Sequence, residues 1–386
     1  MCYTRPGEGN RVPATVVIVG GGVMGLSAAW HLRRANPTTR VTVLERFRVG
    51  AAASGASAAG VRAMGRDPAE RPLALASLAR WPDLARELEH ETGYRRGGGL
   101  RVALDDAAWR AAPGWVAEQH ADGVPVEIAG AAALKDLALG LAPGVLGGVH
   151  CAIDGQAEAM TTVHAFAAAA RRHGARIQEG VGTAALVVER GRVVTVTTTT
   201  GTREPCDVAI VAAGTWSAGL LGRLGVRPPI ETRALQMLLT DPAPGALTPV
   251  ISAFDRKLSF KQLAGGAYLI GGGWPADVPD EAANRWTLRE DSVRASLAVA
   301  REVYPPVAEL KVAQVWAGLE AFTPDGLPVL GPVPGLDNVL VAAGFCGHGF
   351  ALSPMAGDVL ARLALGLDAR PGLWRGLRAD RFSGGS

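Results

Sequence analysis

A glycine-rich turn between a predicted strand and a predicted helix constrains the fold of this chain more than any other feature. The turn, Gly20-Gly21-Gly22-Val23-Met24-Gly25, fits the pattern G-x-G-x-x-G. It follows a β-branched run, Thr15–Val19, that is typical of a strand buried on both faces. A helix is expected over residues 23–34 and a second strand over residues 40–44. Strand, turn, helix and strand form a βαβ unit, which crosses over right-handed in a parallel sheet.

Each glycine of this turn has a separate physical role in binding a dinucleotide. Gly20 permits the tight turn, Gly22 lets backbone N–H groups approach a pyrophosphate, and Gly25 lets the helix pack closely on the strand. The partial positive charge at the helix N-terminus favours the phosphates. Glu45, at the end of the second strand, can accept hydrogen bonds from an adenosine ribose. The alternative is a plain turn with Glu45 as a solvated strand end, but the complete context favours a dinucleotide site.

Two further glycine junctions help to distinguish between the candidate dinucleotides. The predicted strand 207–213 ends in Gly214, and the predicted strand 338–343 ends in Gly344. The small-residue stretch 49–65 suggests that a ligand approaches its backbone closely. An extended FAD would contact all three junctions, whereas the first glycine turn alone is also compatible with NAD. We therefore predict FAD and keep an NAD-dependent dehydrogenase as an alternative.

The chain length and the later strands indicate two interleaved domains. A chain of 386 residues exceeds one ordinary domain and is too short for three. Short runs beyond residue 228 suit an antiparallel sheet. We predict the mixed α/β fold class, with a Rossmann-like FAD-binding domain and a second, antiparallel-sheet substrate domain. The FAD-binding domain is assigned to residues 13–90, 151–225 and 318–386, and the substrate domain to residues 91–150 and 226–317.

The last predicted helix follows the glycine-rich segment 344–349. Ser353 is expected to be its N-cap and Pro354 its first helical residue, because these residue types favour those positions. Residues 355–365 then form the helix, which Gly366 ends. The positive N-terminus of this helix is expected to stabilise negative charge on a reduced flavin.

The composition excludes several other classes of protein. The net charge of +3 comes from scattered Lys and Arg, so neither nucleic acid nor an anionic membrane surface is an expected partner. Neither a signal peptide nor an integral membrane segment is expected, because no run of 18 uninterrupted apolar residues occurs. The four cysteines include no C-x-x-C pair, which argues against a metal site and fits a cytoplasmic protein. Cys346 is expected to be a buried, unreactive thiol.

Five segments together resemble the D-amino-acid oxidase family of FAD-dependent oxidoreductases. The resemblance spans most of the chain, from Val16 to about Leu365. Within the family, the chain is most similar to the group of glycine and sarcosine oxidases, proline and hydroxyproline dehydrogenase subunits, and opine oxidase subunits. The matching segments are residues 19–25 (VGGGVMG), 54–62 (SGASAAGVR), 211–217 (VAAGTWS), 323–328 (TPDGLP) and 344–350 (GFCGHGF).

This resemblance implies the reaction, the cofactor and most of the cofactor-binding residues. The implied reaction oxidises the C–N bond of an amino acid or secondary amine, such as glycine, sarcosine, proline, a D-amino acid or an opine. A hydride passes from the substrate α-carbon to flavin N5, and water hydrolyses the resulting imine. FAD is expected to be non-covalent. The expected cofactor contacts are Gly20, Gly22, Val23, Met24, Gly25, Glu45, Arg46, Ser54, Ser57, Gly60, Val181, Ala213, Gly214, Trp216, Gly344, Gly347, His348, Gly349 and Phe350.

Four residues are candidates for the catalytic site. His348 matches the family's Gly-His-Gly and is expected beside flavin or substrate, with a loop histidine bonded to backbone as the alternative. Arg62 is expected to anchor a substrate carboxylate or contact the flavin, unless it is an exposed surface residue. Gln236, on a predicted strand of the substrate sheet, faces either the pocket or solvent. Glu320 either attracts a cationic amine or is a partnered surface acid.

The chain departs from the family pattern at three positions. Glu320 stands where glycine and D-amino-acid oxidases have an Arg that pairs with the substrate carboxylate, and a carboxylate cannot replace a guanidinium. The oxygen-activating Lys of monomeric sarcosine oxidases aligns with Leu269, and their flavin-linked Cys aligns with Gly318. The expected electron acceptor is therefore O2, a quinone or a partner subunit. The alternative function is a non-catalytic flavin-bearing subunit or assembly factor of a larger dehydrogenase complex.

Overall fold

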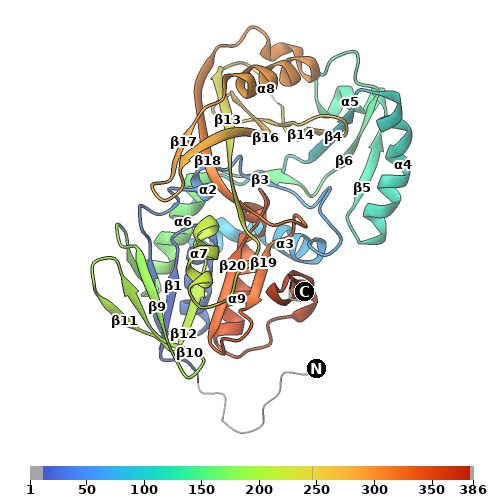
Figure 1. Cartoon of the computed structure of the whole chain (residues 1–386). Helices are drawn as coiled ribbons and strands as arrows, with labels where there is room; N and C mark the ends of the chain where they lie inside the picture. The colour runs from blue at the N-terminus through green and yellow to red at the C-terminus, as the bar shows by residue number, and fades with distance from the viewer. Residues whose placement is uncertain (1–11, 246, 383–386) are drawn as a thin grey trace.

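Two large sheets organise the chain in the computed structural model, which describes residues 12–245 and 247–382 (Figure 1). A mainly parallel sheet occupies the lower half of the view, and a mainly antiparallel sheet occupies the upper half. The mixed α/β fold class predicted from the sequence is confirmed. None of the helices in this part of the chain combines the length and the apolar character that a membrane span requires.

The mainly parallel sheet contains the βαβ unit predicted from the glycine turn. Among the described residues its strand order is β19-β20-β12-β1-β2-β8, and β19 alone runs antiparallel to its neighbour. Helix α1 (Val23–Ala35) connects β1 to β2 and ends at Asn36, directly before Pro37. The strands are β1 (Thr15–Val19), β2 (Arg40–Leu44), β8 (Arg176–Gln178), β12 (Val208–Val211), β19 (Val329–Pro332) and β20 (Val339–Ala343).

The two faces of this sheet are covered by different structures. Val16 and Ile18 of β1 pack in a core shared with α1, α3, α6 and α9, whereas Val17 and Val19 pack against a small antiparallel sheet, β9-β10-β11. Arg190 and Gly191, both with positive φ, form the hairpin turn between β9 and β10. These elements are α3 (Arg71–Leu88), α6 (Ala159–Arg172), α9 (Gly349–Ala364), β9 (Thr183–Glu189), β10 (Arg192–Thr198) and β11 (Arg203–Pro205).

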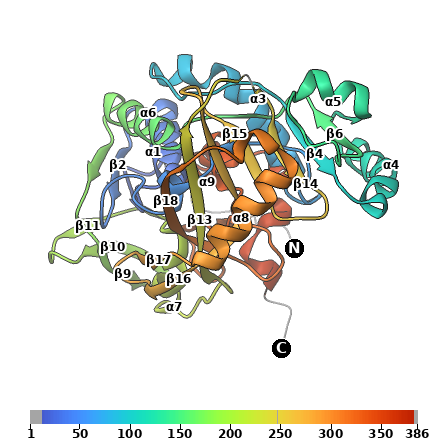
Figure 2. The ribbon, with the colours of Figure 1, turned by 90° about the horizontal axis from the view of Figure 1, so that it is seen from above.

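The second sheet is mainly antiparallel, as predicted. In the described ranges its order is β18-β13-β16-β15-β14-β4-β6-β5, with β17 paired to β16. Helix α8 (Glu290–Val303) lies over β13 and β16 when the molecule is seen from above (Figure 2). Strand β18 (Val312–Phe322) reaches down to the parallel sheet, so the domain boundary predicted between residues 317 and 318 falls inside one strand.

The remaining elements connect or flank these sheets. Strands β3 and β7 pair with each other between the two sheets. The bounds are β3 (Gly60–Val61), β4 (Gly99–Ala103), β5 (Val126–Ala129), β6 (Gly147–Cys151), β7 (Gly155–Gln156), β13 (Glu231–Pro242), β14 (Val250–Ala253), β15 (Ser259–Gln262), β16 (Ala267–Asp280), β17 (Arg285–Thr287), α2 (Ala53–Ala56), α4 (Asp106–Ala121), α5 (Ala131–Leu137) and α7 (Ser217–Gly222).

Helix α9 begins more than one turn earlier than the sequence predicted. Its N-cap is His348 and its first residue is Gly349, so Ser353 and Pro354 lie inside the helix. Proline has no N–H to donate to the carbonyl four residues earlier. The Ser353 hydroxyl instead donates to that carbonyl, Phe350 O, at 2.9 Å. The prediction of Ser353 as the N-cap was therefore wrong, because Ser353 compensates for Pro354 within the helix.

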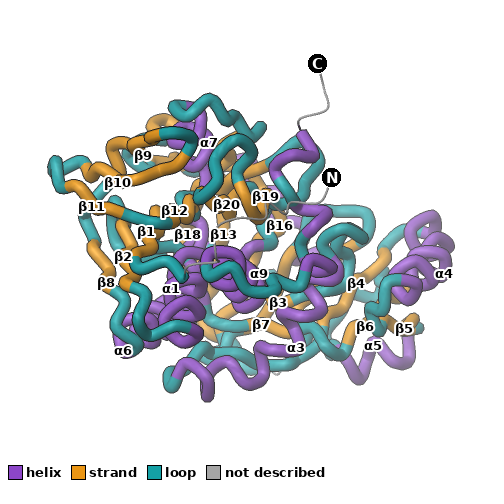
Figure 3. The backbone as a smooth tube through the Cα atoms, turned by 90° about the horizontal axis from the view of Figure 1, so that it is seen from below, coloured by secondary structure: helices purple, strands orange, loops and turns teal. Residues whose placement is uncertain are grey.

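Side chains of α1 and α3 bond to the next four carbonyls of α9. Seen from below, α1 and α9 lie side by side (Figure 3), and a Cβ atom added at Gly357 of α9 would overlap Ser27 of α1. These contacts fix the first turns of α9 against its neighbours. The hydrogen bonds are Trp81 Nε1 to Ala351 O (2.9 Å), Ser77 Oγ to Leu352 O (3.2 Å), Ser27 Oγ to Ser353 O (2.8 Å) and His31 Nε2 to Pro354 O (2.9 Å).

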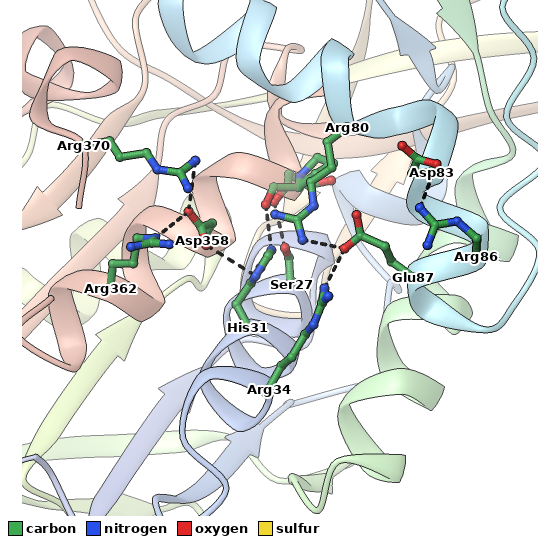
Figure 4. A network of polar contacts seen from close by, with 12 residues as sticks. Ser27, His31, Arg34, Arg80, Asp83, Arg86, Glu87, Asp358, Arg362 and Arg370 are labelled. Carbon is green, nitrogen blue, oxygen red and sulfur yellow. Dashed lines mark hydrogen bonds and ion pairs between the residues drawn. The ribbon is translucent and has the colours of Figure 1, made fainter. Parts of the chain in front are cut away.

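Charged groups extend this contact between α1, α3 and α9 (Figure 4). His31 Nδ1 lies 3.6 Å from Asp358 Oδ1, and Arg34 and Arg80 each lie 2.6 Å from Glu87 Oε2. Burial and the nearby positive charge of Arg80 hold the pKa of His31 well below its ordinary value. A neutral His31 therefore bonds the α9 backbone at neutral pH, and α9 is held in place by two helices.

Candidate functional site

Strands β1, β12 and β20 of the parallel sheet all end at one cavity of about 480 Å³. The three strand-to-glycine junctions predicted from the sequence therefore lie together at the carboxyl edge of the sheet. This is the edge at which parallel sheets bind ligands. The predicted cofactor residues in the cavity wall are Gly20, Gly22, Val23, Met24, Glu45, Arg46, Ser54, Ser57, Ala213, Gly214, Trp216, Gly344, Gly347, Gly349 and Phe350.

Two glycines of the first turn lie too close to backbone carbonyl oxygens to carry a side chain. A Cβ atom added at Gly20 would overlap the carbonyl oxygen of Ala212, and one at Gly25 would overlap the carbonyl oxygen of Gly20. At Gly22 an added Cβ would lie 3.0 Å from Ser54 Oγ, the end of a short side chain. Gly20 and Gly25 are thus required by the packing of the protein itself, whereas Gly22 leaves space on the side of the cavity.

Glu45 presents its carboxylate in the cavity wall at the end of β2. Oε2 accepts a hydrogen bond from the Gly21 N–H at 2.7 Å, and Oε1 accepts one from the Phe47 N–H at 2.7 Å. Burial raises the pKa of Glu45, and these two N–H donors act in the opposite direction. Because each carboxylate oxygen has two lone pairs, Glu45 keeps acceptor capacity for ribose hydroxyls.

Two helices direct their N-termini at the cavity. The first residues of both α1 and α9 belong to its wall. Within the described ranges, neither N-cap residue, Gly22 or His348, makes a side-chain cap hydrogen bond, and neither first turn contains an acidic residue. Their backbone N–H groups and partial positive charge are therefore suited to an anionic ligand.

Four predicted cofactor residues lie outside the cavity wall. Gly25 acts through the packing of α1, and Gly60 pairs with Gln156 in the small β3–β7 sheet. The Val181 N–H donates to the carbonyl of Glu45 at 2.8 Å, and the residues that follow Val181 enter the wall in its place. His348 caps α9 next to the wall. A direct cofactor contact of these four residues stays a prediction.

Gln236 points away from the cavity. Its side chain is fully buried against the start of α8, where Oε1 accepts from Arg289 N at 3.2 Å and Nε2 donates to Arg289 O at 3.4 Å. The prediction that Gln236 faces either the pocket or solvent was therefore wrong. The period-2 pattern of a strand shows that its faces alternate, but it does not show which face a helix will cover.

Strand β18 brings Glu320 to the cavity from the antiparallel sheet. Leu319, Glu320 and Ala321 all belong to the wall. Glu320 Oε2 is shielded from solvent and has no hydrogen-bond partner among the residues that the structure describes. It lies close to the α9 turn, 3.5 Å from a Cβ atom added at Gly347. Burial raises the pKa of Glu320 to about 7.

His348 forms a pair with Glu70, the N-cap residue of α3. The His348 Nδ1 atom lies 3.0 Å from Glu70 Oε2 and 3.3 Å from Oε1, so its partner is a side chain and not the backbone. Burial and Arg66 lower the pKa of His348, against the opposing effect of Glu70. Burial disfavours the ionised form of Glu70, but the hydrogen bond to His348 and the charge of Arg66 leave its pKa below its ordinary value. A neutral imidazole therefore donates Nδ1–H to a carboxylate, and Nε2 is left as an acceptor.

Three arginines form a cationic cluster next to this pair. Arg66 Nε donates to Arg62 O at 3.2 Å, and Arg101 lies over the rings of Trp115 (5.2 Å) and Phe254 (4.6 Å). The buried Nε atoms of Arg62 and Arg101 have no hydrogen-bond partner in residues 12–245 and 247–382. Burial lowers the pKa of Arg62 to about 10, and Arg66 acts in the same direction. The buried carboxylate of Asp154 already acts on Arg62 and Arg66, so the three arginines leave an excess of positive charge around one acid, and this excess suits a second carboxylate.

Comparison with known proteins identifies the family. The sequence profile described as "DAO: FAD dependent oxidoreductase" matches residues 15–363. The chain belongs to the DAO family of FAD-dependent oxidoreductases. It is 31% identical to a glycine oxidase of Pseudomonas aeruginosa, over 91% of this chain and 94% of that protein. It is 25% identical to the beta chain of a sarcosine oxidase of Rhodobacter capsulatus, over 90% and 84% of the two chains.

A solved structure of similar fold is the L-proline dehydrogenase from P. horikoshii. It superimposes with a TM-score of 0.87 at 24% identity, covering 96% of this chain and 98% of that one. The arrangement of a parallel and an antiparallel sheet is therefore a DAO-family fold. The cofactor of this chain is FAD.

The cavity fits FAD in its charge and in its close backbone approach. The start of α1, where only the Val23 N–H is bonded to a side chain (Ser54 Oγ, 3.0 Å) among the described residues, and the open side of Gly22 suit the pyrophosphate, and Glu45 suits the ribose. Gly318 has no side chain that could be linked to a flavin, and Ala56 occupies the space that a Cβ atom at this position would need. Cys346 lines the cavity and is half-buried, so the prediction that it is buried was wrong; partial burial still raises the pKa of its thiol, which is the direction expected of an unreactive thiol.

Several polar residues of the site were missed from the sequence. Arg66 and Glu70 follow Arg62 at successive intervals of four residues, which is a signal that could have been read as one cluster. Arg101 and Lys261 lie on strands of the second sheet; the fold brings Arg101 within electrostatic reach of Arg62, whereas the charges that act on Lys261 are those of Arg95 and Glu158. Lys261 pairs in register with Leu269, is 2% exposed and donates from Nζ to Ala157 O at 3.2 Å.

Proposed function

We propose that this chain oxidises the C–N bond of an amino acid or a secondary amine and gives an imine that water hydrolyses. The observation that carries the proposal is the position of β18, which forms part of the cofactor cavity and places Glu320 in its wall. The His348–Glu70 pair lies beside the same α9 turn. When bound, FAD accepts the hydride that leaves the substrate carbon. The protein's part is then to bind, orient and deprotonate the substrate.

The names of related proteins support this reaction class. The relatives include glycine oxidases, the beta chains of sarcosine oxidases and one chain of an opine oxidase of Agrobacterium tumefaciens. Glycine and sarcosine are both amines that carry a carboxylate. Because the sarcosine and opine oxidase relatives are named as subunits, we propose a partner subunit as an electron acceptor for this chain, in addition to O2 and a quinone.

Arg62 is proposed to bind a substrate carboxylate in place of the arginine that is absent at position 320. Its guanidinium is charged at neutral pH, and its Nε has no partner within the described part of the chain. Leaving such a donor unpaired costs about 1–3 kcal/mol, which a bound carboxylate would recover. His348 Nε2 is proposed to accept a hydrogen bond from the substrate or from water beside it.

The test is an anaerobic screen of the purified flavoprotein. D- and L-amino acids, N-methyl amines and cyclic imino acids are added one at a time, and reduction is followed by the loss of flavin colour. At least one of these amines should bleach the flavin within the time of mixing. A flavin that stays oxidised with every amine would contradict the proposal and favour a non-catalytic subunit.

A matched pair of variants tests the carboxylate site. Arg62→Met should raise KM at least tenfold for substrates with a carboxylate and leave simple amines unchanged. Arg110→Met removes the same charge from an exposed position of α4 and should change neither KM. An equal KM effect of Arg62→Met on both substrate kinds would show that Arg62 does not hold the carboxylate.

A further inference from the structure

Glu320 is an acidic side chain in the cavity wall that forms no ion pair with any of the described residues. Its Oε2 atom is shielded from solvent and unpartnered among the described residues, although the residue belongs to the cavity wall. Burial is the cause of its raised pKa, with no basic side chain acting in the opposite direction within residues 12–245 and 247–382. A buried carboxylate without a partner is costly, and in a binding cavity this cost points to a ligand that supplies the missing cation.

The charged groups around Glu320 are directed elsewhere. Arg233 is the cross-strand neighbour of Glu320 on β13, but it pairs with Glu231 at 2.8 Å and lies over the ring of Phe322. On the α9 side, His348 is bound to Glu70. An arginine one strand away is thus held by another acid, and Glu320 remains free to face the cavity.

The thiol of Cys346 is the other titratable group on the α9 side of Glu320. Burial raises the pKa of Cys346, and the carboxylates of Glu70 and Glu320 act in the same direction. Cys346 Sγ donates to Gly344 O at 3.1 Å and stays a neutral thiol at neutral pH. The proton balance of this end of the cavity near pH 7 is therefore set by Glu320.

We propose that Glu320 binds the protonated amino group of the substrate and accepts its proton before oxidation. In this step one N–H bond of the ammonium breaks and an O–H bond forms on the Glu320 carboxylate, so the substrate becomes a neutral amine. The amine lone pair is then available to form the C=N bond as the neighbouring C–H bond loses its hydride. An ammonium has no such lone pair, so it must lose a proton before oxidation. This assignment rests on the proposed amine oxidation.

The proposal specifies the charge of the substrate at this end of the cavity. A carboxylate facing Glu320 would be repelled, whereas an ammonium is attracted and hydrogen-bonded. The substrate class is therefore an amine that enters as a cation, with any carboxylate held away from Glu320. A carboxylate with a pKa of about 7 is also a suitable base, because it can take a proton and release it again near neutral pH.

The test uses the flavin-loaded protein and a cation that cannot react. Tetramethylammonium has no N–H and no proton to donate, so its binding requires the ionised form of Glu320. Isothermal titration calorimetry at pH 7 in two buffers of different ionisation enthalpy measures the protons released on binding. We expect release of about half a proton at pH 7, and weaker binding as the pH falls below that value. Glu320→Gln should weaken binding at least tenfold and abolish proton release.

Two further variants make the outcome decisive. Glu290→Gln removes an exposed carboxylate at the start of α8, on the other side of the sheet, and should bind and release protons as the wild type does. Glu320→Asp keeps the acid and should keep proton release at lower affinity, which also serves if Glu320→Gln loses FAD. Unchanged binding and proton release in Glu320→Gln, or no binding of the cation by the wild type, would overturn the proposal.

The catalytic part has a separate readout. The kcat/KM of the wild type for an amine identified in the anaerobic screen should rise with pH as Glu320 ionises, and Glu320→Gln should lose that rise. If the cation binds with Glu320-dependent proton release but no amine bleaches the flavin, the cation site stands and the proposed oxidation fails. If an amine bleaches the flavin with the same pH profile in both proteins, the oxidation stands and the role of Glu320 fails.

Discussion

Replacing Lys261 with Met should stabilise the protein at neutral pH and destabilise it in alkali. Lys261 lies on β15 with 2% of its surface exposed, and its Nζ donates to Ala157 O. Burial lowers its pKa from the ordinary 10.5 to about 7, with a smaller contribution in the same direction from Arg95. Methionine has nearly the same length and volume but carries no charge, so Lys261→Met tests the cost of the buried ammonium directly.

The size of the effect follows from these values. At roughly 1.36 kcal/mol per unit of pKa, a change from 10.5 to about 7 amounts to roughly 5 kcal/mol when the lysine is charged in both states. The lost hydrogen bond to Ala157 O costs the variant about 1–3 kcal/mol at every pH. At pH 6 the cost of burying the charged lysine exceeds the cost of losing the hydrogen bond, so the variant should be more stable than the wild type by about 2–4 kcal/mol.

The sign of the pH dependence comes from the proton balance of the two states. Between pH 7 and pH 10.5 the unfolded chain keeps the Lys261 proton and the folded protein has released it. The free energy of unfolding of the wild type therefore rises with pH in this window, relative to the variant. Near pH 10 the free-energy cost of burying a charged Lys261 is small, because the unfolded chain also begins to lose this proton. The wild type should then be the more stable protein, because it alone keeps the hydrogen bond to Ala157 O.

The assay is urea unfolding, followed by tryptophan fluorescence at a fixed excess of FAD, between pH 6 and pH 10. The two stability curves should converge and cross as the pH rises. Lys257→Met is the matched control, because Lys257 is an exposed lysine just before the same strand and should leave the pH dependence unchanged. Parallel curves for the wild type and Lys261→Met would refute the claim that Lys261 is neutral in the folded protein at high pH.

Two further predictions concern the cofactor turn and the His348–Glu70 pair. Gly22→Ala should keep the fold but lower FAD affinity at least tenfold (~1.4 kcal/mol), because the added Cβ meets only Ser54 Oγ on the protein side, whereas Gly25→Ala should destabilise the folded protein by about 1–3 kcal/mol through overpacking. Flavin content measures the first effect and thermal unfolding the second. Loss of the fold in both variants would contradict this assignment. Glu70→Gln should lower the pKa of His348 further, since Glu70 is the group that raises it. An NMR titration of the imidazole measures this pKa, and a value that rises or stays constant would contradict the hydrogen bond between His348 and Glu70.

The parallel sheet could be predicted from the sequence because its signals are local. The run 15–19, the glycine turn and the run 40–44 each fit one structure, and their pairing in β1 and β2 follows from the βαβ rule. The junctions at Gly214 and Gly344 were found for the same reason, since a strand followed by glycine is a local pattern. All of these features lie at the carboxyl edge of one sheet, so the cofactor cavity followed from them.

The errors have tertiary causes. Helix α9 starts at Gly349 because side chains of α1 and α3 satisfy the carbonyls around Pro354, and no local rule includes these partners. Gln236 was assigned to the pocket or to solvent because the residues that cover the outer face of β13 come from α8, more than 50 residues later. The hydrogen bond between His348 and Glu70 joins residues 278 positions apart and could not be predicted from the sequence either.

The features that could be predicted are backbone positions of the cofactor site, and those that could not are the partners of side chains expected to contact the substrate. The groups predicted to bind the cofactor are backbone groups at glycine turns and helix ends. These groups are the same in any chain that keeps the turns, so a relative of 25–31% identity can share the cofactor. Side chains of β18 line the cavity beside these backbone groups, and a single exchange there, such as Glu320 for an arginine, reverses the charge at that part of the wall. The family therefore defines a reaction class for this chain, and we propose that the charges at residues 62 and 320 decide which members of that class it can bind.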